Sequence, residues 1–181
     1  LGIRVRSVGG PSLSVESASG YLTDAMVRGT SDAAREIGVE PVPILTYLAT
    51  AIKANGRETP YSLVSALPED VIEGRRPGFA EGASARVTPA RATGEPGRLK
   101  EAPATDQKDR PERPIWLSQW TADDLAAHTG DAVTLEYYLW SDAEGLASSS
   151  SSFVVAGVLP MNGLALDGDL TPEYPGVSTS A

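Results

Sequence analysis

Two hydrophobic periods mark the first elements of the chain. Apolar side chains alternate with polar ones over residues 3–8 and 12–16, which is the period of a half-buried β-strand. Over residues 22–37 they recur near helical spacing instead, and Thr23 or Asp24 can accept the free amide hydrogens at the start of that helix. The pattern therefore predicts two short strands followed by one helix.

A hairpin is predicted after this helix. Gly38 supplies a left-handed stop for the helix, and residues 44–54 then form a nearly continuous apolar run. Asn55 and Gly56 end the run, and this dipeptide favours a tight type I′ turn. We expect the return strand over residues 58–67.

The second part of the chain repeats this order of elements. Residues 115–117 predict a short strand, and Thr121 is the expected N-cap of a two-turn helix that stops at residues 129–130. Strict alternation over residues 132–140 then predicts a half-buried strand. This is the clearest strand signal in the chain.

The last predicted strand completes a second hairpin. Residues 141–152, with their five consecutive serines, are expected to form a polar connection, and residues 153–159 to return as a buried strand. The predicted fold class is α+β, with two strand-helix-hairpin units and mixed or antiparallel sheets. Residues 1–72 form the first unit and residues 115–181 the second.

A low-complexity insert, residues 73–114, joins the two units. Its 42 residues include 9 basic and 7 acidic side chains, 6 prolines and 5 glycines. Only Phe79, Val87 and Leu99 are large and apolar, so the segment cannot bury a core of its own. We expect it to be disordered or extended.

Charge and composition exclude several function classes. The 181 residues carry a net charge of −9 at pH 7, and without the insert 6 basic residues face 17 acidic ones. A nucleic-acid partner is therefore not expected, because phosphates are bound by clustered Lys and Arg. The absence of cysteine excludes thiolate chemistry, Cys-based metal sites and disulfides.

No catalytic set emerges from the side chains that could carry one. His128 is the only histidine and is expected at a helix C-terminus. There its side chain interacts favourably with the helix dipole and with the last carbonyl groups. The serines at 148–152 lack the strand-turn-helix context of a nucleophile. Asp123 and Asp124 point about 100° apart on a helix and complement its N-terminal dipole more simply than they form a paired site. We predict no catalytic residue.

The sequence contains two candidate binding sites, and each has a plainer interpretation. One is a calcium site in a single loop, built from Asn162, Asp167, Asp169 and Glu173, whose spacing does not match an EF-hand and whose plainer interpretation is an exposed turn. The other is an aromatic sugar-binding platform, and its plainer interpretation is packing of the same rings in the core or in an interface. Its candidate rings are Trp116, Trp120, Tyr137, Tyr138 and Trp140. We predict no metal ion and no cofactor.

Six blocks of sequence carry a family resemblance. They are residues 43–52 (PILTYLATAI), 56–67 (GRETPYSLVSAL), 115–125 (IWLSQWTADDL), 130–138 (GDAVTLEYY), 153–160 (FVVAGVLP) and 169–176 (DLTPEYPG). In order and spacing they resemble the large extracytoplasmic domain of FtsX-like ABC transporter permeases, often called the MacB-like periplasmic core. The insert has no counterpart in this resemblance.

The resemblance implies a function without an active site in this chain. A separate cytoplasmic ATPase subunit hydrolyses ATP in such transporters, and no phosphate-binding loop ending in Lys and Ser or Thr occurs here. The resemblance implies that the domain lies outside the cell membrane, tethered by membrane helices beyond these residues. No run within this sequence reaches the roughly 18 apolar residues of a span. Implied partners are that ATPase, a second permease subunit, and a periplasmic protein or exported substrate.

Two other interpretations stay open at this point. A secreted hydrolase or carbohydrate-binding module would account for the acidic surface and the aromatic strand, and would need converging carboxylates or an exposed aromatic row. The second of these other interpretations is a structural or adaptor domain without a transported substrate. The presence of flanking membrane helices in the whole gene separates these interpretations from the permease.

Overall fold

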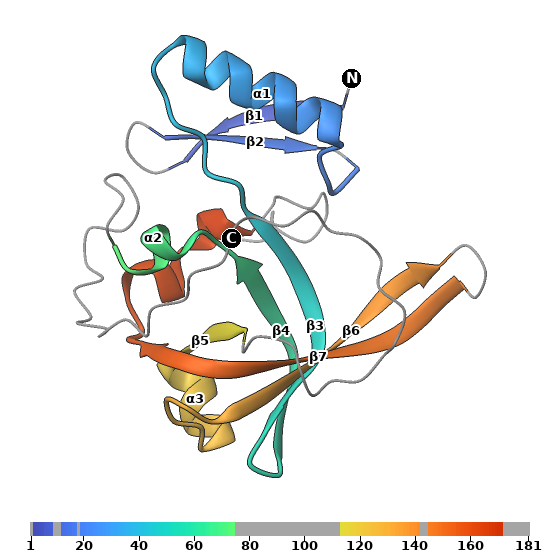
Figure 1. Cartoon of the computed structure of the whole chain (residues 1–181), viewed down its shortest axis with the longest axis vertical. Helices are drawn as coiled ribbons and strands as arrows, with labels where there is room; N and C mark the ends of the chain where they lie inside the picture. The colour runs from blue at the N-terminus through green and yellow to red at the C-terminus, as the bar shows by residue number, and fades with distance from the viewer. Residues whose placement is uncertain (1, 9–11, 18, 75–112, 142–144, 172–181) are drawn as a thin grey trace, which may run out of the picture.

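Seven strands and three α-helices make up the described part of the protein, an α+β fold as predicted. The structure, a computed structural model, describes residues 2–8, 12–17, 19–74, 113–141 and 145–171 (Figure 1). The elements are β1 (Ile3–Ser7), β2 (Leu13–Ser17), α1 (Asp24–Glu36), β3 (Leu45–Ala54), β4 (Arg57–Ala66), α2 (Glu69–Ile72), β5 (Pro114–Ser118), α3 (Gln119–Leu125), β6 (Ala132–Ser141), β7 (Gly145–Leu159) and the 3₁₀ turns η2 (Gly163–Leu166) and η3 (Gly168–Leu170).

One five-stranded sheet combines strands from both sides of the predicted insert. Its order is β4-β3-β6-β7-β5, with antiparallel pairing everywhere except between β5 and β7, which run parallel. The predicted hairpins β3–β4 and β6–β7 are therefore confirmed, and they lie next to each other through the β3–β6 pairing. The insert itself is an expectation that falls almost wholly on residues 75–112, outside the described residues.

The turn between β3 and β4 has the predicted geometry. Asn55 and Gly56 both have positive φ angles, 52° and 75°. A type I′ turn requires this at both central residues, and its twist matches that of the flanking strands. The register follows directly, with Ala54 opposite Arg57.

The N-terminal elements form a second layer at one end of the molecule (Figure 1). β1 and β2 pair antiparallel in a sheet of their own, and α1 lies beside them. The Thr23 side chain accepts a hydrogen bond from the Met26 amide at 3.4 Å, which confirms the predicted N-cap, and Gly38 has the expected left-handed φ of 75°. No residue of α1 is buried, so this layer is held by few apolar contacts.

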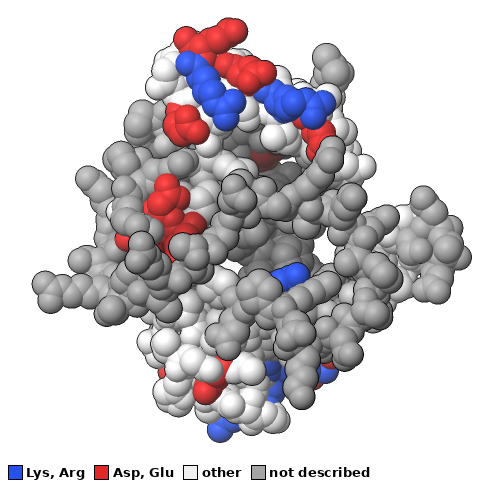
Figure 2. Space-filling model, viewed as in Figure 1, with Lys and Arg blue, Asp and Glu red and all other residues white. Residues whose placement is uncertain are grey.

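Charged side chains of both signs gather over the end of the molecule formed by α1 (Figure 2). The helix itself carries Asp24, Arg28, Asp32, Arg35 and Glu36. Arg35 and Asp32 are 3.4 Å apart and both are well exposed, a geometry that contributes little to stability. This layer is thus solvated on the outside.

The hydrophobic core lies between α3 and the five-stranded sheet. Leu125 on α3 and Leu135 on β6 are both fully buried. The buried apolar residues of this cluster are Ala49, Ile52, Ala54, Leu117, Ala122, Leu125, Ala127, Val133, Leu135 and Val155. Strands from both parts of the chain contribute, so the two parts share one core.

The boundaries of α3 differ from the prediction at both ends. The N-cap is Ser118 rather than Thr121: the Ser118 hydroxyl accepts a hydrogen bond from the Thr121 amide at 3.2 Å. The helix ends at Leu125 because Ala126 adopts a left-handed conformation, with φ of 47°, well before residues 129–130. The Ala127 amide then donates to the Ala122 carbonyl at 2.8 Å, closing the helix as a glycine-type cap would.

The expected polar connection over residues 141–152 is also wrong. β7 runs without interruption from Gly145 to Leu159, and its serines pair residue by residue with β6. Even-numbered residues from 146 to 152 are exposed, whereas odd-numbered residues from 145 to 153 are half-buried. Serine has no strong strand preference, so the cross-strand partners and not the serines themselves hold this conformation.

None of the helices in the described ranges is long and apolar enough to cross a membrane.

Candidate binding surface on the β6–β7 hairpin

The outer half of the β6–β7 hairpin projects from the sheet (Figure 1). β3 pairs with β6 only at residues 134–136, and β5 pairs with β7 only from Val154 onward. Within the described residues, 137–141 of β6 and 145–149 of β7 therefore pair only with each other. No other described strand pairs with either edge of this arm, and an unpaired strand edge can bind a ligand or a further strand.

One face of the arm carries exposed aromatic and aliphatic side chains. Trp140 lies directly opposite Leu146, and Tyr138 lies opposite Ser148. Trp140 is 75%, Leu146 62% and Tyr138 56% exposed. Directly opposed residues in an antiparallel pair point to the same face, so these three side chains form one surface.

The same face continues toward the base of the hairpin with polar side chains. Glu136 lies opposite Ser150, and Thr134 opposite Ser152. We call the surface formed by Thr134, Glu136, Tyr138, Trp140, Leu146, Ser148, Ser150 and Ser152 the hairpin face. It combines three large exposed side chains at its outer end with a row of hydroxyl groups along β7.

An ion-pair network closes the hairpin face at its base. Lys53 Nζ lies 2.7 Å from Glu136 Oε1 and 3.4 Å from Glu58 Oε2. Its hydrogen bond to Glu136, followed by the charges of both carboxylates, raises the pKa of the Lys53 amine. Because all three side chains are 40–52% exposed, the network orients these side chains but contributes little to stability.

On the opposite face of the arm, Tyr137 contacts the sheet, whereas Leu139 is 51% exposed. The rings of Tyr137 and Tyr47 meet edge to face with centroids 6.0 Å apart and an angle of 70° between them. The Tyr137 and Ser151 hydroxyls are hydrogen-bonded at 2.9 Å. Burial, and to a smaller extent Tyr137, raises the pKa of Tyr47, as expected for a phenol removed from water.

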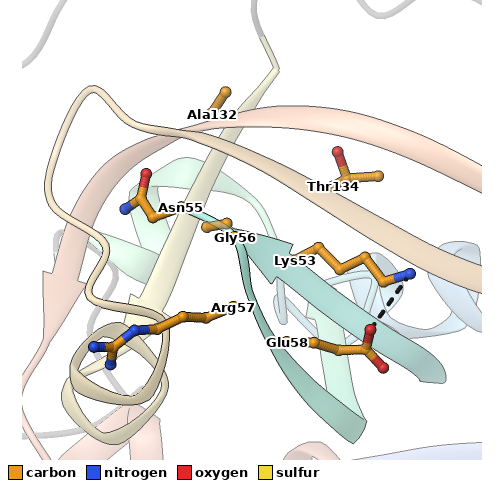
Figure 3. A pocket seen from close by; sticks show the side chains of 8 residues that line it. Lys53, Asn55, Gly56, Arg57, Glu58, Ala132 and Thr134 are labelled. Carbon is orange, nitrogen blue, oxygen red and sulfur yellow. Dashed lines mark ion pairs between the residues drawn. The ribbon is translucent and has the colours of Figure 1, made fainter.

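A shallow hollow lies next to the base of the hairpin, at the β3–β4 turn (Figure 3). It has a volume of about 490 Å³ and is lined by Lys53, Ala54, Asn55, Gly56, Arg57, Glu58, Ala132 and Thr134. The Lys53–Glu58 ion pair crosses one side, while Asn55 and Arg57 point toward α3 and the loop that follows it (Figure 3). The polar side chains here are thus turned to structural contacts.

Those contacts join the turn to the loop after α3. Asn55 Nδ2 donates to the Ala126 carbonyl at 2.8 Å and to Asp131 Oδ2 at 3.0 Å, and Arg57 Nη1 donates to the Asp124 carbonyl at 3.1 Å. The Asn55 hydrogen bond, with one from the His128 amide, holds the pKa of Asp131 below its usual value. This carboxylate acts as a structural acceptor.

The structure does not assemble the enzymatic candidates into a site. His128 lies in the loop after α3, not at the helix C-terminus, with its imidazole exposed and Nδ1 3.8 Å from Asp131 Oδ2. Asp123 accepts a hydrogen bond from Gln119, and Asp124 accepts one from the buried Thr59 hydroxyl. Both lie near the C-terminal end of α3, so the expectation of a dipole role at its N-terminus is wrong.

The calcium candidates are also used separately. Asp167 accepts a hydrogen bond from the Asp169 amide at 2.9 Å, and Asp169 lies 2.8 Å from Arg6. Asn162 makes no side-chain capping bond to η2, and Glu173 lies outside the described residues. Within the described ranges, no group of three or more His, Cys, Asp or Glu residues could hold a metal ion.

The five aromatic candidates separate into different environments. Trp116 is half-buried on β5, and its Nε1 has no hydrogen-bond partner within the described part of the chain. Trp120 is exposed on α3, and Tyr137 packs against Tyr47. Only Tyr138 and Trp140 share a face, as the alternation in residues 132–140 already indicated. Leu146 was missed because the serine run was interpreted as a loop.

Comparisons with known proteins add no identity to this geometry. No protein-family model matches the chain, and no curated protein matches its sequence. The class defined by the structure is therefore an α+β domain with a projecting, partly apolar hairpin.

Proposed function

We propose that this chain is the extracytoplasmic domain of an ABC transporter permease subunit, which engages a periplasmic protein or exported substrate and transmits ATP-driven motion. The observation that carries the proposal is the order and spacing of the six sequence blocks that resemble FtsX-like permeases. Five of these blocks fall wholly or largely on β3, β4, β5 with α3, β6 and β7, which together form the single sheet and its core.

The meeting of early and late segments supports the proposal. Arg6 Nη1 lies 2.8 Å from Asp169 Oδ1, and the Thr46 hydroxyl donates to the Leu170 carbonyl at 2.6 Å. A domain inserted between two membrane helices begins and ends at the same membrane surface, so its first and last segments are expected at the same end of the domain. Contact between β1 and η3 is compatible with that requirement.

In the proposed arrangement the work is divided between subunits. ATP is hydrolysed by a cytoplasmic ATPase subunit, and a second permease subunit completes the transporter. Membrane helices beyond this chain connect the domain to both. The β6–β7 hairpin, which projects from the sheet, is the element best placed to contact a substrate or partner.

Single-cysteine labelling of the whole gene product tests this topology. The chain has no cysteine, so Ala33→Cys, on the exposed surface of α1, would give one reactive thiol within it. A membrane-impermeant maleimide should label this thiol in intact cells after the outer envelope is opened. Leu125→Cys, at a fully buried position, is the matched control and should react only after unfolding.

Two results would contradict the proposal. One is labelling of Ala33→Cys only after the cell membrane is permeabilised, which would place the chain in the cytoplasm. The other is recovery of the mature protein free of the membrane, with no ATPase co-purifying in mild detergent. That second result would favour the secreted alternatives.

A further inference from the structure

We propose that the hairpin face binds an extended, neutral, β-linked glycan chain. The juxtaposition that carries this proposal is an exposed aromatic pair beside a row of serine hydroxyls on one face of a two-stranded hairpin. Glycan binding here does not depend on the chain being part of a permease, so the two proposals fail independently.

The aromatic side chains provide the stacking part of the site. Tyr138 and Trp140 are two residues apart on the same strand, so their Cα atoms are roughly 6.7 Å apart along it. This spacing is comparable to the length of one sugar residue in an extended chain. Sugar rings present apolar C–H faces that pack on aromatic rings, and Leu146 extends the apolar area opposite Trp140.

The serines provide the polar part of the site. Ser148 and Ser150 lie opposite Tyr138 and Glu136 and are both exposed on the hairpin face. A serine hydroxyl both donates and accepts hydrogen bonds, as each sugar hydroxyl does. A row of them alongside aromatic rings matches a ligand whose ring faces are apolar and whose edges are hydroxylated.

Charge selects a neutral glycan over an acidic one. The cation at the base of the face, Lys53, is already engaged by Glu136 and Glu58. The whole chain has a net charge of −9 at pH 7. A polyanion, including an anionic lipid surface, would therefore be repelled.

The composition of the face favours a glycan over a protein partner. Protein interfaces are enriched in Trp and Tyr but depleted in Ser, and serine is rarely a binding hot spot. Three of the eight residues of the hairpin face are serines, and all three lie on β7. A protein partner would leave many of these hydroxyls to be desolvated without matched partners.

Titration calorimetry of the complete 181-residue chain tests the site. The probes are two hexasaccharides, one of β-1,4-linked glucose and one of β-1,4-linked N-acetylglucosamine, with β-linked polyglucuronate as the acidic control. We expect at least one neutral hexasaccharide to bind and the acidic glycan not to bind. Trp140→Ala should weaken binding about tenfold, and Ser150→Ala about threefold.

Trp120→Ala is the matched control, because Trp120 is 59% exposed but lies on α3, away from the hairpin face. The affinity of the Trp120→Ala variant for the hexasaccharide should equal that of the unsubstituted chain. Circular dichroism should show that this variant, Trp140→Ala and Ser150→Ala are all folded. The proposal is overturned if neither hexasaccharide binds at about 5 mM. Equal losses in the two tryptophan variants would overturn it as well.

Sedimentation velocity separates a glycan site from a protein interface. With the hairpin face free, the chain should sediment as a monomer at micromolar concentration. A dimer that Trp140→Ala dissociates would show that a second copy covers the face, and would overturn the glycan assignment.

Discussion

Truncation of Leu125 should reveal how much of the stability depends on the shared core. Leu125 is the last residue of α3, has no exposed surface, and packs in the same cluster as Leu117 on β5 and Leu135 on β6. Leu125→Ala removes the equivalent of about three methylene groups at ~0.8 kcal/mol each, or about 2.4 kcal/mol of transfer free energy. The cavity that remains adds to this, so we expect a loss of about 2–5 kcal/mol.

The result can be measured by urea unfolding of the complete chain, followed by circular dichroism. With a slope of about 2 kcal/mol per molar urea, the midpoint should fall by roughly 1–2.5 M. Leu63→Ala is the matched control, because Leu63 lies on β4 and is 58% exposed, and its midpoint should change little. Equal midpoints for the two variants would refute the assignment of a single core joining both parts of the chain.

Three further predictions concern the loops and the N-terminal layer. Ala126→Gly should raise the free energy of unfolding by about 0.5–1 kcal/mol, measured in urea, because glycine tolerates the positive φ of Ala126. Asp131 has a lowered pKa, so its contribution is present above the unfolded-state pKa and is lost as pH falls through the folded-state value; Asp131→Asn should therefore flatten acid unfolding. Arg6→Gln should speed proteolysis of β1 and β2 by breaking the ion pairs of Arg6 with Glu16 on β2 and with Asp169, while the core stays protected.

Local sequence signals were sufficient where the backbone itself makes a demand. Asn55 and Gly56 predicted the β3–β4 turn because few other dipeptides accept two positive φ angles. Thr23 predicted the start of α1 because a hydroxyl there satisfies a free amide. Period-two alternation predicted β6, since one side of that strand must be buried.

Tertiary contacts decided the elements that the sequence predicted wrongly. Ser118 and Thr121 are both good capping residues, and the parallel pairing of β5 with β7 brings the chain into α3 at Ser118. Ala126 gives no sequence signal for a left-handed cap, because its positive φ is held by the bonds of the surrounding loop. The serines of β7 extend only because β6 lies beside them.

The candidate surface could be predicted only in part for the same reason. Alternation places Tyr138 and Trp140 on one face of β6 without any knowledge of the fold. Their neighbours Leu146 and Ser148 come from β7, and this register needs the hairpin to be known. A binding surface made of two strands is therefore invisible to an analysis that treats each segment by itself.

Folding and binding use alternate residues of the same strand in this hairpin. Val133 and Leu135 are fully buried, and Tyr137 continues their side of β6 into the contact with Tyr47. Tyr138 and Trp140 point the other way and remain exposed, so their removal takes little apolar surface out of the core. Binding through the hairpin face can consequently be removed without unfolding the protein, and a loss of glycan affinity in Trp140→Ala would report on the surface itself.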